Sequence, residues 1–220
     1  MKIAPSLLAA PLTKISEALL SLKPGETDFL HLDVMDGHFV PQLSFGEAIC
    51  EAIAKETTVP LDVHLMVSQP EIQVPKYFNM KPAYISFHYE ATSFPIRLAQ
   101  SIRKEGIKAA LAVNPVTPIE ALVDLIPYFD MFLLMSIEPG FYGQSFLENS
   151  YDRIERFARH RDAYNKASGG SVLIEVDGGV SDKNIRRLKD VGVDVCVAGS
   201  FVFKGGNPGE KIRLLKKQCE

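Results

Sequence analysis

The chain contains little cysteine. Its three cysteines, Cys50, Cys196 and Cys219, are scattered and odd in number, and none belongs to a Cys-x-x-Cys pair. Disulfide frameworks and cysteine-built zinc sites both need paired cysteines, so neither is expected here. We therefore expect a cytoplasmic protein whose chemistry depends on other side chains.

Long apolar runs and a strong charge bias are missing as well. No stretch reaches the length of a transmembrane helix, and Pro5 interrupts the apolar run of residues 3–10. Since only one lysine precedes that run, we expect a first strand there rather than a signal peptide. A net charge of −3 provides no broad basic surface for nucleic acid. The expected partners are a small molecule and further copies of the chain, with no nucleic acid and no membrane.

Short apolar runs alternate with amphipathic stretches along all 220 residues. Hydrophobic residues make up 46% of the chain, which is enough for one core. Eight strand–helix units without a linker rich in proline, glycine or serine predict one domain over residues 1–220, a single (β/α)8 TIM barrel of the α/β class. The predicted strands are residues 3–7, 29–34, 61–66, 83–87, 108–113, 131–136, 172–176 and 193–198, and the predicted helices are residues 13–22, 45–55, 95–104, 119–125, 150–166, 182–190 and 208–218.

The alternative architecture is an open, doubly wound sheet. That fold commonly carries a glycine-rich dinucleotide fingerprint after its first strand. Here the sequence at that place is Pro5-Ser6-Leu7-Leu8-Ala9, which contains no glycine. The barrel is therefore the architecture that we predict.

Acidic and imidazole side chains alternate with aliphatic ones in three of the predicted strands. Side chains alternate between the two faces of a strand, so each of these strands has one apolar face and one face of potential ligands. Because parallel barrel strands are buried on both sides, such polar groups must be hydrogen-bonded, paired or bound to a metal ion. The ligand faces carry His31 and Asp33, Asp62 and His64, and Glu175 and Asp177.

Four of these side chains, His31, Asp33, His64 and Asp177, lie at the carboxyl ends of their strands, where barrel enzymes gather their chemistry. Two imidazoles and two carboxylates suit one divalent ion of Zn2+, Fe2+, Mn2+ or Co2+ better than Ca2+ or Mg2+. A metal-free network of buried His–Asp hydrogen bonds is the alternative. In either case, the two deeper carboxylates on the same faces could orient the outer residues.

Two glycine turns follow the predicted seventh and eighth strands. Each turn leads into a predicted helix, and Ser181 is the expected N-cap of the first. Glycine lets the backbone approach an anion, and helix N-termini direct N–H groups toward it. We therefore expect a phosphate here, held mainly by backbone amides rather than by Lys or Arg. The turns are Asp177-Gly178-Gly179-Val180-Ser181 and Val197-Ala198-Gly199-Ser200.

The loop at residues 138–146 mixes glycines with aromatic residues. It includes Gly140, Phe141, Tyr142 and Gly143. Such a composition is typical of a hinged lid that closes over a ligand. A surface loop anchored by its aromatic side chains is the alternative.

Seven motifs follow one another along nearly the whole chain. They are Ala4-Pro5-Ser6-Leu7-Leu8, His31-Leu32-Asp33-Val34-Met35-Asp36-Gly37-His38-Phe39-Val40-Pro41, Asp62-Val63-His64-Leu65-Met66-Val67, Phe87-His88-Tyr89-Glu90-Ala91, Met135-Ser136-Ile137-Glu138-Pro139-Gly140-Phe141, Glu175-Val176-Asp177-Gly178-Gly179-Val180 and Ala198-Gly199-Ser200. Their identity and order resemble the ribulose-phosphate 3-epimerase family. The resemblance implies a TIM barrel that interconverts D-ribulose 5-phosphate and D-xylulose 5-phosphate in the pentose phosphate pathway, so the small-molecule partner would be a sugar phosphate.

The resemblance also implies roles for single residues. One divalent ion would be bound by His31, Asp33, His64 and Asp177. Inversion of C3 needs a base on one face and an acid on the other, and for ribulose 5-phosphate Asp33 would be the proton acceptor and Asp177 the donor. The implied substrate contacts are Ser6, His64, Gly140, Phe141, Tyr142, Gly143, Asp177, Gly178, Gly179, Gly199 and Ser200.

Three other functions are alternatives to this one. A D-allulose 6-phosphate 3-epimerase would use the same chemistry on a sugar one carbon longer, and Tyr142, where the family usually has a small residue, is expected to narrow the space for it. Decarboxylases of the same barrel group use an Asp-x-Lys-x-x-Asp pattern, but the run Asp33-Val34-Met35-Asp36 has no lysine. The acid/base pair argues against a non-catalytic sugar-phosphate-binding barrel.

Overall fold

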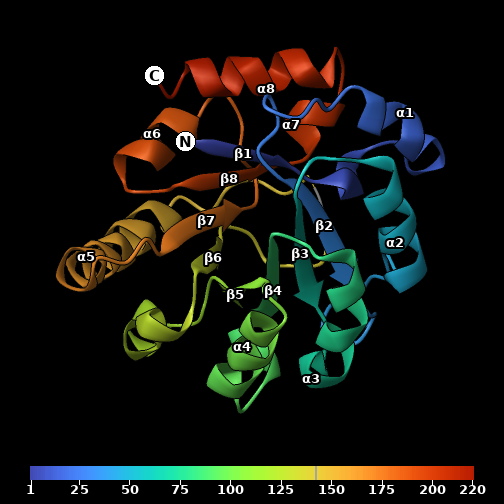
Figure 1. Cartoon of the computed structure of the whole chain (residues 1–220). Coiled ribbons are helices and arrows are strands. Elements are labelled where there is room, and N and C mark those ends of the chain that lie inside the picture. Colours follow the sequence, from blue (N-terminus) through green and yellow to red (C-terminus); the bar gives the residue numbers. More distant parts are fainter. Residues whose placement is uncertain (142) are drawn as a thin grey trace.

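One sheet of eight parallel strands forms the centre of the molecule (Figure 1). The computed structural model describes residues 1–141 and 143–220. Neighbouring strands pair in the order β1-β8-β7-β6-β5-β4-β3-β2, as a barrel requires. The strands are β1 (Lys2–Pro5), β2 (Leu30–Met35), β3 (Leu61–Met66), β4 (Tyr84–His88), β5 (Lys108–Val113), β6 (Met131–Met135), β7 (Leu173–Asp177) and β8 (Val195–Ala198).

The barrel closes where β1 meets β2. An isolated parallel bridge joins Ser6 to His31, and the N–H of Asp28 donates to the carbonyl of Ile3 over 3.3 Å. Other neighbours share longer ladders, as in β2 and β3, where Asp33 pairs with His64. The predicted (β/α)8 TIM barrel is confirmed, and its closing bridge includes a predicted metal ligand.

The two faces of the sheet have different cores. On the outer face, apolar side chains such as Leu65 and Phe132 pack against the helices in one large cluster. The inner face carries smaller clusters, one around Ala110 and Met131 and another that includes Met135. Burial of apolar surface on both faces stabilises the closed sheet. The predicted polar side chains lie on the inner face, at its open end.

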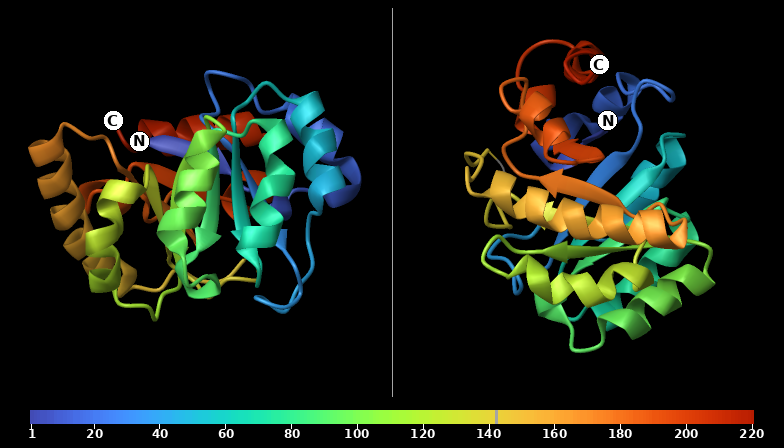
Figure 2. Two further views of the ribbon diagram at one scale, coloured as in Figure 1. Left: turned by 60° about the horizontal axis from the view of Figure 1, so that its bottom comes forward. Right: turned by 90° about the vertical axis from the view of Figure 1, so that its left-hand side faces the viewer.

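Helices surround the sheet on its outer side (Figure 2). Among the described residues, no helix has the length and apolar character needed to cross a lipid bilayer. The helices are α1 (Ile15–Leu20), α2 (Glu47–Glu56), α3 (Pro70–Gln73), α4 (Pro95–Lys104), α5 (Ser150–Ser168), α6 (Ile185–Asp190), α7 (Ser200–Phe203) and α8 (Pro208–Lys217), and the 3₁₀ segments are η1 (Leu7–Ala9), η2 (Leu12–Lys14), η3 (Val74–Met80), η4 (Tyr89–Ala91) and η5 (Ile119–Tyr128).

Several boundaries differ from those predicted. The first strand ends at Pro5, and Leu7 begins η1 instead of ending the strand. The helix predicted at residues 119–125 is the 3₁₀ segment η5, which contains Pro127, a residue that lacks the N–H needed for a helical hydrogen bond. No helix range was predicted between β3 and β4, where α3 runs directly into η3.

The expected N-cap of the helix after β7 was wrong. The helix α6 begins at Ile185, so Asn184 is its N-cap. Ser181 lies in the preceding turn, where its hydroxyl accepts a hydrogen bond from the Lys183 N–H at 3.3 Å. The side chain of Asn184 in turn accepts from the Ser181 N–H at 2.9 Å. Because Ser181 and Asn184 hydrogen-bond within this turn, α6 begins about one turn later than predicted.

Candidate active site

A cavity of about 420 Å³ opens at the carboxyl ends of the strands. Among the residues expected to contact substrate or metal, His31 and His64 are fully buried and contact Asp33. Tyr142 lies outside the described residues, so its expected effect on the lid stays a prediction. The expected residues that line the cavity are Ser6, Asp33, Gly140, Phe141, Gly143, Asp177, Gly178, Gly179, Gly199 and Ser200.

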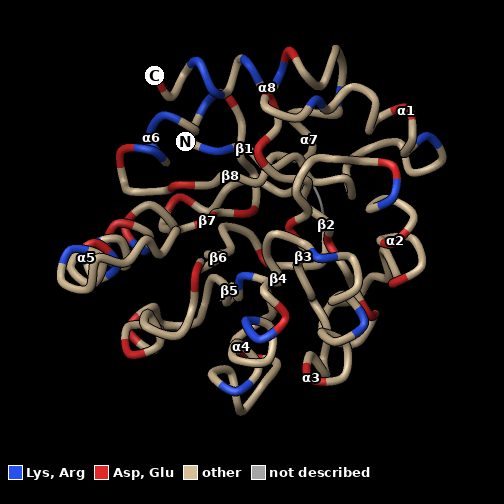
Figure 3. Tube along the Cα trace, viewed as in Figure 1, with Lys and Arg blue, Asp and Glu red and all other residues tan. Residues whose placement is uncertain are grey.

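Carboxylates are concentrated at one place inside the barrel. Figure 3 shows that most charged residues lie on the outer helices and loops. In the described strands, the carboxylates are Asp33, Asp62, Glu175 and Asp177. Three of them are buried, and Asp177 lines the cavity. Burial of several acidic groups is costly unless they are paired or bind a cation, so this concentration indicates a functional site.

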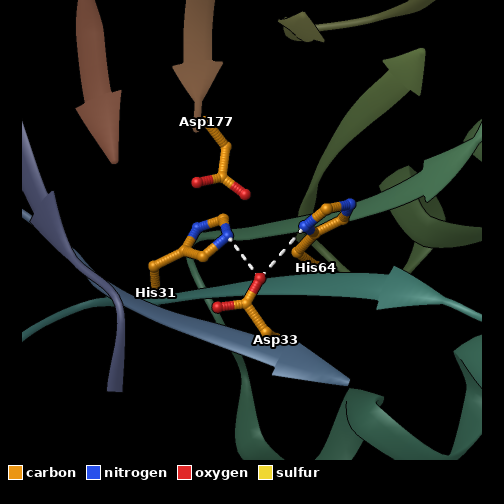
Figure 4. A group of neighbouring side chains, drawn as sticks. All are labelled: His31, Asp33, His64 and Asp177. Carbon is orange, nitrogen blue, oxygen red and sulfur yellow. Dashed lines mark ion pairs between the residues drawn. The ribbon is translucent and has the colours of Figure 1, made fainter. Parts of the chain in front are cut away.

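Four side chains from three strands converge beside the cavity (Figure 4). His31 and Asp33 come from β2, His64 from β3 and Asp177 from β7. Asp33 Oδ1 lies 3.4 Å from His31 Nε2 and 3.4 Å from His64 Nδ1. One ligand atom from each of the four residues lies within 4.8 Å of the others. The alternating pattern in the sequence therefore brings these residues together as expected.

The two imidazoles have the properties of metal ligands. His31 Nε2 and His64 Nδ1 are buried and have no hydrogen-bond partner among the described residues. The second nitrogen of each ring is engaged, His31 Nδ1 by Asp62 at 2.5 Å and His64 Nε2 by His88 at 2.9 Å. Engagement of one nitrogen leaves the other free to face a cation. Two such nitrogens with two carboxylates fit one Zn2+, Fe2+, Mn2+ or Co2+ ion.

The two carboxylates of this group differ in their pKa values. Burial raises the pKa of Asp177 to about 7, and the charge of Asp33 adds to the rise. Burial also acts on Asp33, but the imidazoles of His31 and His64, each with a nitrogen 3.4 Å from its Oδ1, hold its pKa well below the usual range. Near neutral pH the metal-free site therefore combines an ionised Asp33 with an Asp177 that can hold a proton. Such a difference between neighbouring carboxyl groups is typical of an acid/base pair.

Ser6 and a group of methionines complete this end of the cavity. The Ser6 hydroxyl donates to Asp33 Oδ2 at 2.5 Å, so the other oxygen, Oδ1, faces the imidazoles. Met35, Met66 and Met135 line the cavity beside these groups. Thioethers are apolar and polarizable, and they exclude water from the carboxylates without competing for their hydrogen bonds.

The glycines after β7 are required by backbone conformation and by close contacts. Gly178 has a φ of +121°, and a Cβ there would lie 2.5 Å from Ile137 Cγ1. Gly179 has a φ of +65°, and its Cβ would lie 2.5 Å from the backbone nitrogen of Phe146. Neither position accepts a larger residue without displacing its neighbour. The two glycines therefore fix the turn against the loop that follows β6.

The opposite wall of the cavity contains groups suited to an anion. The Ser200 hydroxyl is buried and has no partner among the described residues. Lys183 and Lys204 also line the cavity. The prediction that backbone amides, rather than Lys or Arg, hold the phosphate gave neither lysine a role. A lysine that follows a short helix, as Lys204 follows α7, has no sequence signal that separates it from a surface residue.

The loop after β6 is fastened at several points. The Gln144 side chain donates to the carbonyls of Glu138 and Phe141 at 2.7 and 3.0 Å. Gly140 has a φ of +109° and packs against Val40, where a Cβ would lie 3.0 Å from the valine Cβ. Phe141 is 46% exposed. The described part of the loop thus lines the cavity and presents one aromatic ring to solvent, and its closure as a lid stays a prediction.

Two residues beyond the predicted set, one at the end of β4 and one in η4, lie behind His64. His88 is fully buried against His64, and Glu90 contacts the other side of the His88 ring. Burial lowers the pKa of His88, and the interaction with Glu90 opposes this change. No metal-binding or catalytic role was assigned to His88 from the sequence. The available signal was the spacing in His88-Tyr89-Glu90, an imidazole followed by a carboxylate at the end of a strand.

Sequence comparisons identify a family. The model of the ribulose-phosphate 3 epimerase family matches residues 2–203. A ribulose-phosphate 3-epimerase of Helicobacter pylori strain ATCC 700392 / 26695 is 42% identical over 204 residues, which cover 93% of this chain and 91% of that protein. The ribulose-phosphate 3-epimerase of Mycobacterium tuberculosis strain ATCC 25618 / H37Rv is 38% identical over 217 residues, which cover 99% of this chain and 92% of the relative. The resemblance inferred from the motifs is confirmed.

Solved structures agree on the fold. KGPDC from Streptococcus mutans in complex with D-R5P has a TM-score of 0.72 at 12% identity and covers 99% of this chain and 96% of that one. The 3-hexulose-6-phosphate synthase from Salmonella typhimurium has a TM-score of 0.71 at 14% identity and covers 100% of this chain and 98% of that one. At such low identity, these likenesses bear on the barrel alone.

Proposed function

The chain belongs to the ribulose-phosphate 3-epimerase family, and from this premise we propose that it inverts C3 of D-ribulose 5-phosphate to give D-xylulose 5-phosphate with the help of one divalent metal ion. Membership makes the chain an epimerase. The metal, the proton-transfer residues and the substrate contacts are the finer parts of the proposal.

The observation that carries the proposal is the convergence of Asp33 from β2 and Asp177 from β7 on one cluster with two buried imidazoles. C3 lies next to the C2 ketone, so its hydrogen is acidic enough for a base to remove once the ketone oxygen is stabilised. Inversion requires that a proton return to the other face. In the metal-free chain, Asp33 stays ionised beside its imidazole neighbours, and burial raises the pKa of Asp177 to about 7. This difference supports Asp33 as the acceptor of the first proton and Asp177 as the donor of the second. The reverse reaction exchanges their roles.

The metal ion would be held by His31 Nε2, His64 Nδ1 and the carboxylates of Asp33 and Asp177. When bound, it supplies Lewis-acid stabilisation for the negative charge that develops on the ketone oxygen during proton removal. Zn2+, Fe2+, Mn2+ and Co2+ all suit this set of donors.

The other residues hold the sugar phosphate. Ser6 fixes the carboxylate of Asp33 and faces the cavity. The substrate phosphate is assigned to the turns that contain Gly178, Gly179, Gly199 and Ser200, where the unpartnered Ser200 hydroxyl supports an anion site. The loop with Gly140, Phe141, Tyr142 and Gly143 is assigned as the lid, which would exclude water from the reacting carbon.

The proposal treats residues 1–220 as one catalytic domain. The family model spans residues 2–203, which supports a single unit of function over nearly the whole chain. We assign the enzyme to the cytoplasm as a homo-oligomer, acting on a small-molecule sugar phosphate.

The test uses purified chain prepared without added metal and then supplied separately with Zn2+, Fe2+, Mn2+ or Co2+. In deuterated water, ribulose 5-phosphate should become xylulose 5-phosphate with solvent deuterium at C3, because the returned proton comes from a group that exchanges with solvent. D-allulose 6-phosphate serves as the competing substrate. Absence of turnover with all four ions, or faster turnover of the six-carbon sugar, would contradict the assignment.

A further inference from the structure

The ring of His64 rests on a second imidazole. His64 Nε2 lies 2.9 Å from His88 Nε2, and the two rings stack at 26° with centroids 5.0 Å apart. Both side chains are fully buried. A hydrogen bond between two ring nitrogens holds one proton, which belongs to one ring and is accepted by the other. The direction of this bond decides which His64 nitrogen carries hydrogen.

Glu90 sets that direction. His88 Nδ1 faces Glu90 Oε2 at 3.4 Å, and an ionised carboxylate only accepts hydrogen bonds. A proton on His88 Nδ1 therefore leaves His88 Nε2 as the acceptor. His64 must then carry its proton on Nε2. Its buried Nδ1 lies 3.4 Å from Asp33 Oδ1 but makes no hydrogen bond, so it keeps a lone pair for an ion held by the cluster in Figure 4.

Glu90 is itself held by the loop that follows β5. Its Oε1 accepts hydrogen bonds from the Asn114 N–H at 2.8 Å and from the Thr117 hydroxyl. Arg153 of α5 fastens the same loop, with its guanidinium donating to the carbonyls of Asn114 and Thr117 at 2.7 and 2.8 Å. These four bonds hold the carboxylate beside His88.

We propose that His88 and Glu90 are positioning residues that hold His64 in the tautomer whose bare Nδ1 binds the metal ion. This inference rests on the metal site of the proposed function. His31 reaches the same state by a shorter route, through a direct contact with Asp62 at 2.5 Å. Outer partners of this kind typically contribute 10–100-fold to metal affinity.

The first experiment measures zinc affinity of the metal-free full chain by competition with a chromophoric chelator. His88→Leu keeps similar bulk but offers His64 no acceptor, and its zinc dissociation constant should rise about 10–100-fold. His88→Gln restores a carbonyl acceptor and should recover most of the loss. Glu90→Gln should weaken zinc binding by a smaller factor, whereas Glu105→Gln, an exposed control at the end of α4, should leave it unchanged.

The second measurement reads the tautomer of His64 in the metal-free chain from long-range proton–nitrogen NMR correlations. The native chain should carry the proton on Nε2, and His88→Leu should show a mixture of both tautomers. The inference would be overturned if His88→Leu had the zinc affinity and the His64 tautomer of the native chain. It would also be overturned if His88→Leu and His88→Gln lost the same amount of zinc affinity. Failure of the native chain to bind one zinc ion would refute the metal site instead, and the tautomer would still decide the role of His88.

Discussion

The two ends of the cavity are built by different means. At the proposed metal end, the potential ligand atoms belong to side chains, and some are oriented by another side chain, as Asp33 is by Ser6 and His31 is by Asp62. At the proposed phosphate end, the surface is largely backbone, shaped by glycines such as Gly178 and Gly179 whose φ values are positive.

This difference determines how each end responds to mutation. A site made of side-chain atoms loses function when one functional group is replaced, even if the new side chain fits the fold. A backbone site tolerates changes of nearby side chains and fails when the turn itself is displaced. Four predictions test this contrast, from the largest expected effect to the smallest.

Asp177→Asn should lower the rate of epimerisation by about 10²–10⁴-fold. The amide has nearly the same size as the carboxyl but returns no proton, so Asp33 could still deprotonate ribulose 5-phosphate. Deuterium should then wash from solvent into unreacted substrate while almost no xylulose 5-phosphate forms, as followed by NMR. Metal content must be matched between the chains, since Asp177 is also a proposed ligand. Near-normal epimerisation by the metal-loaded variant would contradict the two-carboxylate mechanism.

Asp177 should also make the metal-free chain less stable as pH rises. Its pKa is about 7 in the folded chain and near 3.8 when unfolded, so the folded state binds the extra proton between these values. The free energy of unfolding should therefore fall by up to about 1 kcal/mol per pH unit from pH 4 to 7 because of this group.

Urea unfolding at several pH values isolates that contribution as the difference between the native chain and Asp177→Asn. The difference should grow from pH 4 to 7 in favour of the variant and level off above pH 7. A constant difference across this window would mean that Asp177 titrates normally.

At the proposed phosphate end, Gly179→Ala should destabilise the turn by more than the cost of placing an alanine at a positive φ. The φ of +65° costs an alanine roughly 1–2 kcal/mol. The new Cβ would in addition lie 2.5 Å from a backbone atom of Phe146, which must move. Gly169→Ala is the matched control, because Gly169 has a φ of +69° and nothing within 4 Å of a Cβ. KM for the sugar phosphate should rise in Gly179→Ala and stay unchanged in Gly169→Ala. Equal KM values in the two variants would show that the contact with Phe146 does not matter for substrate binding.

Removal of a lysine from the same end should have the smallest effect. Lys204 lines the cavity but is exposed, and water screens an exposed charge, so its contribution to substrate binding should be small. Lys204→Met should raise KM by less than about tenfold and leave kcat unchanged, with Lys217→Met in α8 as the control. A rise of 100-fold or more would show that the phosphate end depends on a side chain, and the contrast between the two ends would fail.

The same contrast explains what could be predicted from the sequence. Alternation along β2, β3 and β7 identifies His31, Asp33, His64 and Asp177 because strand geometry fixes which way a side chain points. The role of His88 depends on a 2.9 Å contact between rings from two strands, and no local pattern specifies that distance.

Helical segments show a similar limit. The range of α4 agrees with its apolar periodicity at residues 95–104. The periodicity of residues 119–125 also indicates a helix, but it does not distinguish the 3₁₀ segment η5 from an α-helix.

The two neighbouring strands with the least pairing, β1 and β2, meet at the candidate active site. β1 and β2 meet at the bridge between Ser6 and His31, and the Ser6 hydroxyl binds Asp33 on the same strand as His31. An ion held between β2, β3 and β7 would stabilise only the closed sheet, so its binding should slow amide hydrogen exchange at the junction of β1 and β2 before it slows exchange elsewhere.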